Sequence, residues 1–159
     1  MSLIGKEIGD FSVEAYHDNS FKTISKEDVL GKWSVFFFYP ADFTFVCPME
    51  LEDLADQYDE FKKAGCEVYS VSCDSHFVHK QWHEQSEKIK KIKYPMLADP
   101  AHVLAKDFEV LIDCDGMTER GRSIVYYKPQ ECKKHHNKSG QRRFNRRIVK
   151  ELFRQKIIT

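Results

Sequence analysis

The chain has 159 residues, 42% of them hydrophobic and 31% charged, which is the balance of a single soluble domain with a substantial core. Its formal net charge is zero, which argues against nucleic acid or a membrane surface as a partner. No apolar run reaches the roughly 18 to 20 residues of a membrane helix, and residues 1–7 do not have the pattern of a signal peptide, so we expect a cytosolic protein.

Two strands, a short helix and a third strand are predicted before Pro40. Residues 11–16 alternate apolar and polar side chains, as a half-buried strand does, and residues 21–24 are its expected hairpin partner. Ser25, with Asp28 three residues later, is the expected N-cap of a short helix. Residues 32–39 form a continuous apolar run, which is typical of a strand covered on both faces.

Strands and helices continue to alternate after Pro40. In chain order we expect a helix over 51–61 that ends at Gly65, a strand over 66–72, a helix capped by Asp74 or Ser75 that runs to about Lys91, an extended segment at 94–97, a helix over 101–108, and strands over 109–112 and 123–127 around a turn at 113–116. This alternation predicts an α/β fold in which helices cover both faces of a sheet.

The charge balance changes abruptly after Gly121. Residues 1–121 carry 13 Lys and Arg against 23 Asp and Glu, a net of −10, whereas residues 122–159 carry 12 against 2, a net of +10. We therefore divide the chain into a domain over 1–121 and a basic tail over 122–159. Within the tail we expect loop or disorder over 128–141 and an amphipathic helix over 148–158.

The cysteine content suits a protein whose thiols are kept reduced. There are five cysteines and no Cys-x-x-Cys pair, which argues against a secreted disulfide scaffold. In the cytosol a disulfide is more often transient and catalytic. The positions are Cys47, Cys66, Cys73, Cys114 and Cys132.

Cys47 lies where a loop becomes a helix, with Pro48 suited to the first helical turn. The N–H groups of a helix start favour negative charge, so a thiolate is stabilised there, and the thiolate is the form that attacks an O–O bond. Thr44 is placed to hydrogen-bond the peroxide and the sulfur, and Pro40 is placed to shield the sulfur from water. Arg120 is the only arginine before residue 122, and we expect it to stabilise the negative charge of the thiolate and of the developing alkoxide. The alternative is a buried structural cysteine.

Residues 38–50, FYPADFTFVCPME, resemble the peroxidatic loop of peroxiredoxins, most closely that of the bacterial alkyl hydroperoxide reductase C branch. Further similar segments are SLIGKE at 2–7, VSCDSHF at 71–77, Trp82-His83 and YPMLADP at 94–100. The resemblance covers residues 1–121 in order. It implies a thioredoxin-like fold with a central mixed sheet flanked by helices, a homodimer or a ring of dimers, and no cofactor or metal.

The same resemblance implies a thiol-specific peroxidase for hydrogen peroxide and organic hydroperoxides. Cys47 matches the cysteine that becomes a sulfenic acid, and Pro40, Thr44 and Arg120 match the rest of the pocket. Glu50 matches a position that helps to orient arginine. A second thiol then reduces the sulfenic acid, and the implied reductant is a flavoprotein disulfide reductase subunit or thioredoxin.

The sequence departs from the family after Gly121, where no Val-Cys-Pro segment with the usual resolving cysteine follows. The tail has the composition of an A/T-rich gene read out of frame, so a frameshift is a hypothesis that resequencing the gene would test. We expect an altered last strand and helix, with an exposed sheet edge. Cys132 is the one tail thiol that could replace the resolving cysteine. Without it, an external thiol would have to recycle Cys47.

Three other interpretations stay open from the residues alone. A metal site could use Cys73, His76, His79 and His83, with Cys132, His135 and His136, but solvent-facing helix residues and a strand-end thiol explain the pattern as well. The run QRRFNRR at 141–147 could bind nucleic acid, although no base-stacking module accompanies it. The chain could also be a catalytically impaired peroxiredoxin remnant with an interaction or chaperone-like role.

Overall fold

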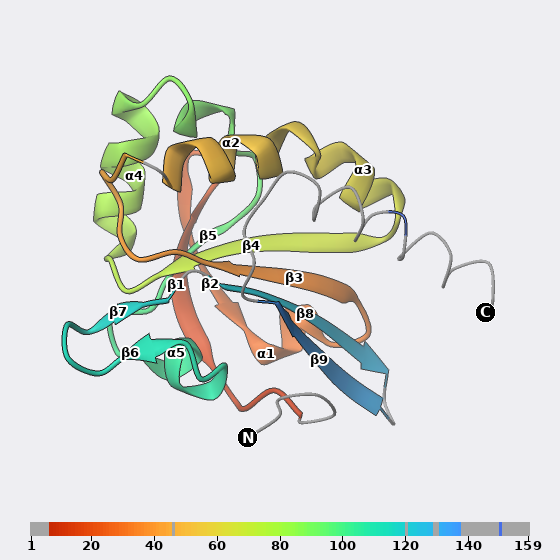
Figure 1. The fold of residues 1–159 in the computed structure, drawn as a ribbon. Coiled ribbons are helices and arrows are strands. Elements are labelled where there is room, and N and C mark those ends of the chain that lie inside the picture. Colours follow the sequence, from red (N-terminus) through yellow and green to blue (C-terminus); the bar gives the residue numbers. More distant parts are fainter. Residues whose placement is uncertain (1–6, 46, 120, 129–130, 138–149, 151–159) are drawn as a thin grey trace.

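Seven strands form one mixed sheet in the order β2-β1-β5-β4-β3-β8-β9 in the computed structural model, which describes residues 7–45, 47–119, 121–128, 131–137 and 150 (Figure 1). The strands β3, β4 and β5 run parallel to one another, and the other neighbours pair antiparallel. Their bounds are β1 Ser12–His17, β2 Ser20–Ser25, β3 Trp33–Phe38, β4 Cys66–Ser72, β5 Met96–Ala98, β8 Gly121–Lys128 and β9 Glu131–Asn137.

Helices cover both faces of the sheet, as Figure 1 shows. One face carries α2 Cys47–Asp56, α3 Tyr58–Lys63, α4 His76–Gln85 and the 3₁₀ turn η1 Ile89–Lys91. The other face carries α1 Lys26–Val29, α5 Val103–Asp107 and the hairpin of β6 Leu111–Ile112 with β7 Met117–Thr118. The predicted α/β fold with a mixed sheet flanked by helices is therefore confirmed.

The central strand β3 supplies side chains to two separate cores. Val35 and Phe37 belong to the core under α2, α3 and α4, whereas Phe36 and Phe38 belong to the core on the opposite face, and all four are at most 2% exposed. This explains why the strand reads as a continuous apolar run rather than as an alternating one.

Both predicted helix caps are present. The backbone N–H of Ser25 donates to the carboxylate of Asp28 at 2.8 Å, at the start of α1. Ser75 Oγ accepts from the Val78 N–H at the start of α4. Asp28 thus satisfies the N–H of the N-cap residue of α1, and Ser75 satisfies a first-turn N–H of α4, groups that would otherwise lack partners.

Two predicted helices are shorter than the apolar pattern suggested. The helix expected to end at Gly65 breaks at Gln57, whose backbone torsions of −101° and 0° leave the helical region between α2 and α3. The helix expected to reach Lys91 ends at Gln85 because Ser86 adopts an extended backbone and its hydroxyl accepts from the Ile89 N–H, which starts the separate turn η1.

The expectation of loop or disorder over 128–141 is wrong for residues 131–137. These residues form β9, and all of β9 pairs with β8. The outer edge of β8 offers unpaired backbone groups, and β9 satisfies them. A basic, polar composition does not prevent this, since edge strands commonly carry Lys. The helix expected over 148–158 lies outside the described residues except for Lys150.

Among the described residues, no helix has the length and apolar character needed to cross a membrane.

Candidate active site

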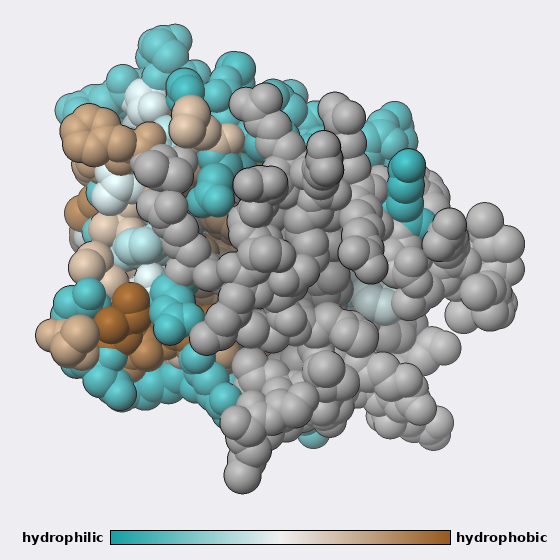
Figure 2. Space-filling model, viewed as in Figure 1, coloured by the Kyte–Doolittle hydropathy of each residue, from teal (hydrophilic) through white to brown (hydrophobic). Residues whose placement is uncertain are grey.

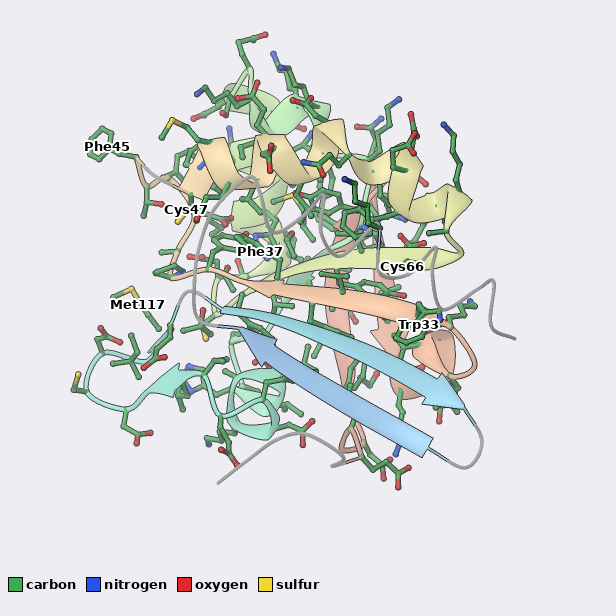
Figure 3. The ribbon with its side chains drawn as sticks, turned by 45° about the vertical axis from the view of Figure 1, so that its right-hand side comes forward. Trp33, Phe37, Phe45, Cys47, Cys66 and Met117 are labelled. Carbon is green, nitrogen blue, oxygen red and sulfur yellow. The ribbon has the colours of Figure 1, made fainter. Side chains whose placement is uncertain are left out.

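The loop that carries Cys47 leaves the sheet at the carboxyl end of β3. The Tyr39 N–H donates to the Val71 carbonyl at 3.1 Å, and the Thr118 hydroxyl donates to the Tyr39 carbonyl at 2.7 Å. These two bonds fix the start of the loop between β4 and β7. The loop then turns back toward the helical face and enters α2 at Cys47 (Figure 3).

Cys47 is the first residue of α2 and is 0% exposed. It belongs to the core that also contains Tyr39, Leu51 and Trp82. Phe45, two residues earlier, is 99% exposed and points away from the molecule in Figure 3. The chain therefore turns from full exposure to full burial within a few residues at the start of the helix.

Two other loop residues predicted for the site lie before Cys47. The Thr44 hydroxyl donates to the Ala41 carbonyl at 3.1 Å, which leaves the lone pairs of its oxygen available to an incoming donor. Pro40 is half-buried at the base of the loop. Pro40 and Thr44 thus both lie in the segment between β3 and Cys47, and their contact with a peroxide stays a prediction.

Phe43 holds the loop in a strained backbone conformation. Its φ of +58° lies in the left-handed region, which bulky side chains rarely adopt. The ring of Phe43 packs 6.0 Å from the ring of the buried Trp82, which also lies 6.0 Å from Tyr39. Aromatic contact with the helix α4 thus stabilises a turn that the backbone alone would not favour.

A buried ion pair anchors the middle of the loop. Asp42 Oδ2 lies 2.6 Å from His79 Nδ1, and both side chains are 0% exposed. The other ring nitrogen, Nε2, lies 3.0 Å from the Leu97 carbonyl oxygen. Burial lowers the pKa of the His79 imidazole, but the hydrogen bond and the charge of Asp42 outweigh it and raise that pKa above its usual value. With an oxygen facing each ring nitrogen, the protonated form of His79 is favoured.

Further hydrogen bonds extend this pair into a network. The Tyr39 hydroxyl donates to Asp42 Oδ1 at 2.6 Å, and the Asp42 N–H donates to Asp74 Oδ2 at 2.9 Å. The Ser72 hydroxyl donates to the same Asp74 oxygen at 2.7 Å. Burial, with the nearby charge of Asp42, raises the pKa of the Tyr39 hydroxyl well above its usual value, so it remains a donor.

The sequence reasoning missed this network and placed His79 on a solvent-facing helix surface, which is wrong. His79 is buried because Asp42 and the Leu97 carbonyl satisfy both of its ring nitrogens. A signal was present in the sequence. Asp42 is the one charged residue between Trp33 and Glu50, and a carboxylate in so apolar a segment requires a buried partner.

Glu50 lies in the first turn of α2, half-buried, and its Oε2 atom is buried with no hydrogen-bond partner among the described residues. Arg120, the predicted cation of the pocket, lies outside the described residues. Its neighbour Gly121 pairs with Phe38 at the end of β3 where the Cys47 loop begins.

Cys132, the predicted replacement for the resolving cysteine, lies in β9 opposite Tyr127. Tyr126, the preceding residue of β8, pairs with Trp33 at the amino end of β3. Because Cys47 follows the carboxyl end of β3, the structure places these two cysteines at opposite ends of the sheet.

The described residues contain no group of three or more His, Cys, Asp or Glu side chains arranged to hold a metal ion. His79 is occupied by Asp42 and Leu97, and His83 Nε2 lies 3.1 Å from the Ile92 carbonyl oxygen. The ring of His76 packs against Phe77 at 4.1 Å. His76, His79 and His83 therefore have other partners, and the side chains of Cys132, His135 and His136 lie outside the described part of the chain.

Exposed aromatic side chains gather around the Cys47 loop and α4. Figure 2 shows apolar and polar side chains side by side along the left-hand margin, where this loop and α4 lie in Figure 1. Phe21 and Phe77 contact each other at 5.3 Å, with 41% and 64% of their surface exposed. Phe43 and Phe45, on the Cys47 loop, are 52% and 99% exposed. We call these four residues the aromatic patch.

A thioredoxin-like sheet with a buried thiol at the start of the helix that follows its central strand defines the peroxiredoxin class of thiol peroxidases. The sequence profile of the AhpC/TSA family matches residues 4–129, and the chain belongs to this family. The match continues past Gly121 through the whole of β8.

Individual relatives agree with this assignment. The chain is 54% identical over 125 residues to alkyl hydroperoxide reductase C of Bacillus subtilis and 50% identical over 127 residues to that of Staphylococcus aureus, and each match covers 79% of this chain and 67% of the relative. The crystal structure of Enterococcus faecalis AhpC superposes with a TM-score of 0.89 at 48% identity, covering 99% of this chain and 95% of that one. Reduced 2-Cys peroxiredoxin of Plasmodium vivax gives 0.84 at 30% identity, covering 98% and 99%.

Proposed function

We propose that Cys47 is the reacting centre of this thiol peroxidase and that hydrogen peroxide and organic hydroperoxides are its substrates. The thiolate attacks one peroxide oxygen, the O–O bond breaks, and the products are the Cys47 sulfenic acid and an alcohol or water. The observation that carries the proposal is the position of Cys47, buried at the first residue of α2. The N–H groups of the first helical turn favour the thiolate there.

Thr44 and Pro40 form the wall of the peroxide pocket. The Thr44 hydroxyl hydrogen is held by the Ala41 carbonyl, so its oxygen accepts a hydrogen bond from the peroxide O–H and orients the substrate toward the sulfur. Pro40 has no N–H and covers the base of the loop, which limits the access of water to the reacting atoms.

Arg120 supplies the positive charge that stabilises the thiolate and the developing alkoxide. Two observations support this role. Gly121, the next residue, pairs with Phe38 at the end of the sheet where the Cys47 loop begins. The buried Oε2 of Glu50 has no partner among the described residues and is suited to accept a hydrogen bond from a guanidinium group.

The relatives named alkyl hydroperoxide reductase C support a hydroperoxide substrate. A sulfenic acid is restored to the thiol by a thiol reductant, so we place the enzyme in the reducing cytosol, and either a flavoprotein disulfide reductase subunit or thioredoxin fits this chemistry. We expect a homodimer or a ring of dimers, and the aromatic patch supports a further contact between copies. A purely structural remnant is disfavoured because hydrogen bonds at Tyr39 and Thr44 hold the described part of the loop before Cys47.

Peroxide consumption with dithiothreitol tests the proposal. The parent chain should consume hydrogen peroxide catalytically, and Cys47→Ser should lose at least about 100-fold in rate because serine is not ionised at neutral pH. Cys114→Ser is the matched control, since Cys114 is exposed in the turn between β6 and β7 and should leave the rate unchanged. Equal rates for the parent and Cys47→Ser would overturn the proposal.

A further inference from the structure

Thr118 donates a buried hydrogen bond to a residue 79 positions away in the chain. Its Oγ1 atom donates to the Tyr39 carbonyl at 2.7 Å, and Thr118 is 0% exposed. Met117, the residue before it, lies on the same side of the molecule as Cys47 in Figure 3. A buried hydroxyl without a partner is unfavourable, so this bond ties β7 firmly to the start of the loop that carries Cys47.

The backbone that carries the Thr118 hydroxyl is itself held in place. Thr118 pairs with Leu111 in the β6–β7 hairpin, and the N–H of the next residue, Glu119, donates to the Val110 carbonyl at 2.7 Å. Val110 is 1% exposed and belongs to the core that contains Phe36. The packing of this core therefore determines where the hydroxyl lies relative to the end of β3.

The acceptor of this bond belongs to the peptide group between Tyr39 and Pro40. The peptide group is planar and Pro40 has no N–H, so hydrogen bonds can hold this plane only at its oxygen. The Tyr39 N–H belongs to the preceding peptide and donates to the Val71 carbonyl at 3.1 Å. The Thr118 hydroxyl therefore orients the plane through which the chain leaves β3 and from which the Pro40 ring projects.

Two residues of the proposed peroxide pocket follow directly after this peptide plane. Pro40 begins the loop, and the next carbonyl, that of Ala41, accepts from the Thr44 hydroxyl at 3.1 Å. A rotation of the plane would therefore move the proline ring and the threonine oxygen together. Asp42 is bonded to α4 through His79 at 2.6 Å, so the loop keeps an attachment to α4 when the contact with β7 is lost.

We infer that Thr118 is a positioning residue for the reaction of Cys47 with peroxide, an inference that rests on the proposed function of Cys47. The Thr118 hydroxyl orients the peptide before Pro40, and thereby the wall that Pro40 and Thr44 form beside the reacting sulfur. Thr118 acts through the Tyr39 carbonyl and touches neither the peroxide nor the sulfur. Its hydroxyl is needed as a donor, and its methyl group is not.

The test measures the rate at which hydrogen peroxide oxidises Cys47 in the full chain, by acid quenching at set times, alkylation and peptide mapping. Thr118→Val keeps the shape of the side chain but removes the donor, and should lower this rate about tenfold, because a misplaced positioning group costs up to about 100-fold. Thr118→Ser keeps the donor and should stay within about threefold of the parent. Thr23→Val removes the exposed threonine bond to Glu14 and, as the control, should stay within about twofold.

Two further readouts separate positioning from a general loss of structure. Alkylation of Cys47 by iodoacetamide requires the thiolate but not the peroxide wall, so its rate in Thr118→Val should stay within about twofold of the parent, whereas a loosened fold would speed the alkylation of this buried thiol. In the Thr44→Val background, the loss caused by Thr118→Val should shrink from about tenfold to less than about threefold, because a group that the bond positions is already absent.

An oxidation rate of Thr118→Val within about twofold of the parent would overturn the inference, as would an undiminished loss in the Thr44→Val background or an equal loss in Thr118→Ser. Faster alkylation together with slower oxidation would assign Thr118 to folding alone and would also overturn it. Thr118→Ala, which lacks the donor as well, carries the same test if circular dichroism shows that Thr118→Val does not fold. Absence of a sulfenic acid adduct on Cys47 of the parent, probed with a 1,3-diketone, would instead refute the proposed function.

Discussion

Replacement of His79 by leucine should destabilise the fold by about 3 to 5 kcal/mol, the usual cost of removing one partner from a buried ion pair. The His79 and Asp42 side chains are 0% exposed and joined at 2.6 Å. Leucine therefore leaves a buried carboxylate that keeps, among the described residues, only the Tyr39 hydroxyl as a side-chain donor. A domain of this size is stable by roughly 5 to 15 kcal/mol, so the loss is a large share of the total.

Urea denaturation of the parent and of His79→Leu measures this loss directly. With a slope of about 2 kcal/mol per molar urea, the midpoint should fall by about 1.5 to 2.5 M. The double variant Asp42→Asn, His79→Leu removes the buried charge as well. Its loss of unfolding free energy should be about 2 kcal/mol smaller than the sum of the losses in the two single variants. Glu60→Gln, in the exposed pair with Lys63, is the control and should cost at most about 0.5 kcal/mol. A loss below about 1 kcal/mol for His79→Leu, or strict additivity in the double variant, would refute the reasoning.

Three further measurements test the pH dependence of the His79 contact and the contacts of two other polar side chains. The raised pKa of His79 means that the folded state binds its proton more tightly than the unfolded state, so its stabilisation is complete below about pH 6.5 and is lost as pH rises through the raised pKa. Urea midpoints should show this decline in the parent, and His79→Leu should flatten it. Ser75→Ala removes the N-cap of α4 and should lower the unfolding free energy by about 1 kcal/mol, whereas an unchanged midpoint would show that the cap contributes nothing. Asp99→Ala removes a buried carboxylate that accepts from the first turns of α5 at 2.8 and 2.7 Å, and should cost about 2 to 4 kcal/mol by the same assay.

Much of the fold follows from local patterns in the sequence. The apolar run of β3 predicted a strand buried on both faces, and the short polar residues at Ser25 and Ser75 predicted two helix starts. These predictions succeed because each depends on residues adjacent in the chain. Cys47 was placed at a helix start by the same kind of local signal, the proline that follows it.

The features that the sequence did not reveal depend on distant residues. His79 meets Asp42 across 37 positions of the chain, and nothing in the helical spacing of the histidines indicates that partner. The strand β9 forms because β8 offers it an edge, although its own composition favours a loop. The helix break at Ser86 is local, and its cause is the Ser86 hydroxyl, which accepts a hydrogen bond from a backbone N–H in place of a backbone carbonyl. The spacing of apolar residues does not indicate such a bond.

The backbone of Phe43 sets a preference in the turn between β3 and α2. A bulky residue at φ +58° stores about 1 to 2 kcal/mol, and that energy is released in any rearrangement that returns Phe43 to the right-handed region. Since about 1.4 kcal/mol changes an equilibrium tenfold, such a rearrangement is roughly ten times more favourable than it would be from an unstrained turn with the same contacts. The ring contact between Phe43 and Trp82 therefore opposes a backbone preference, and its loss would shift this turn, four residues before Cys47, toward other conformations.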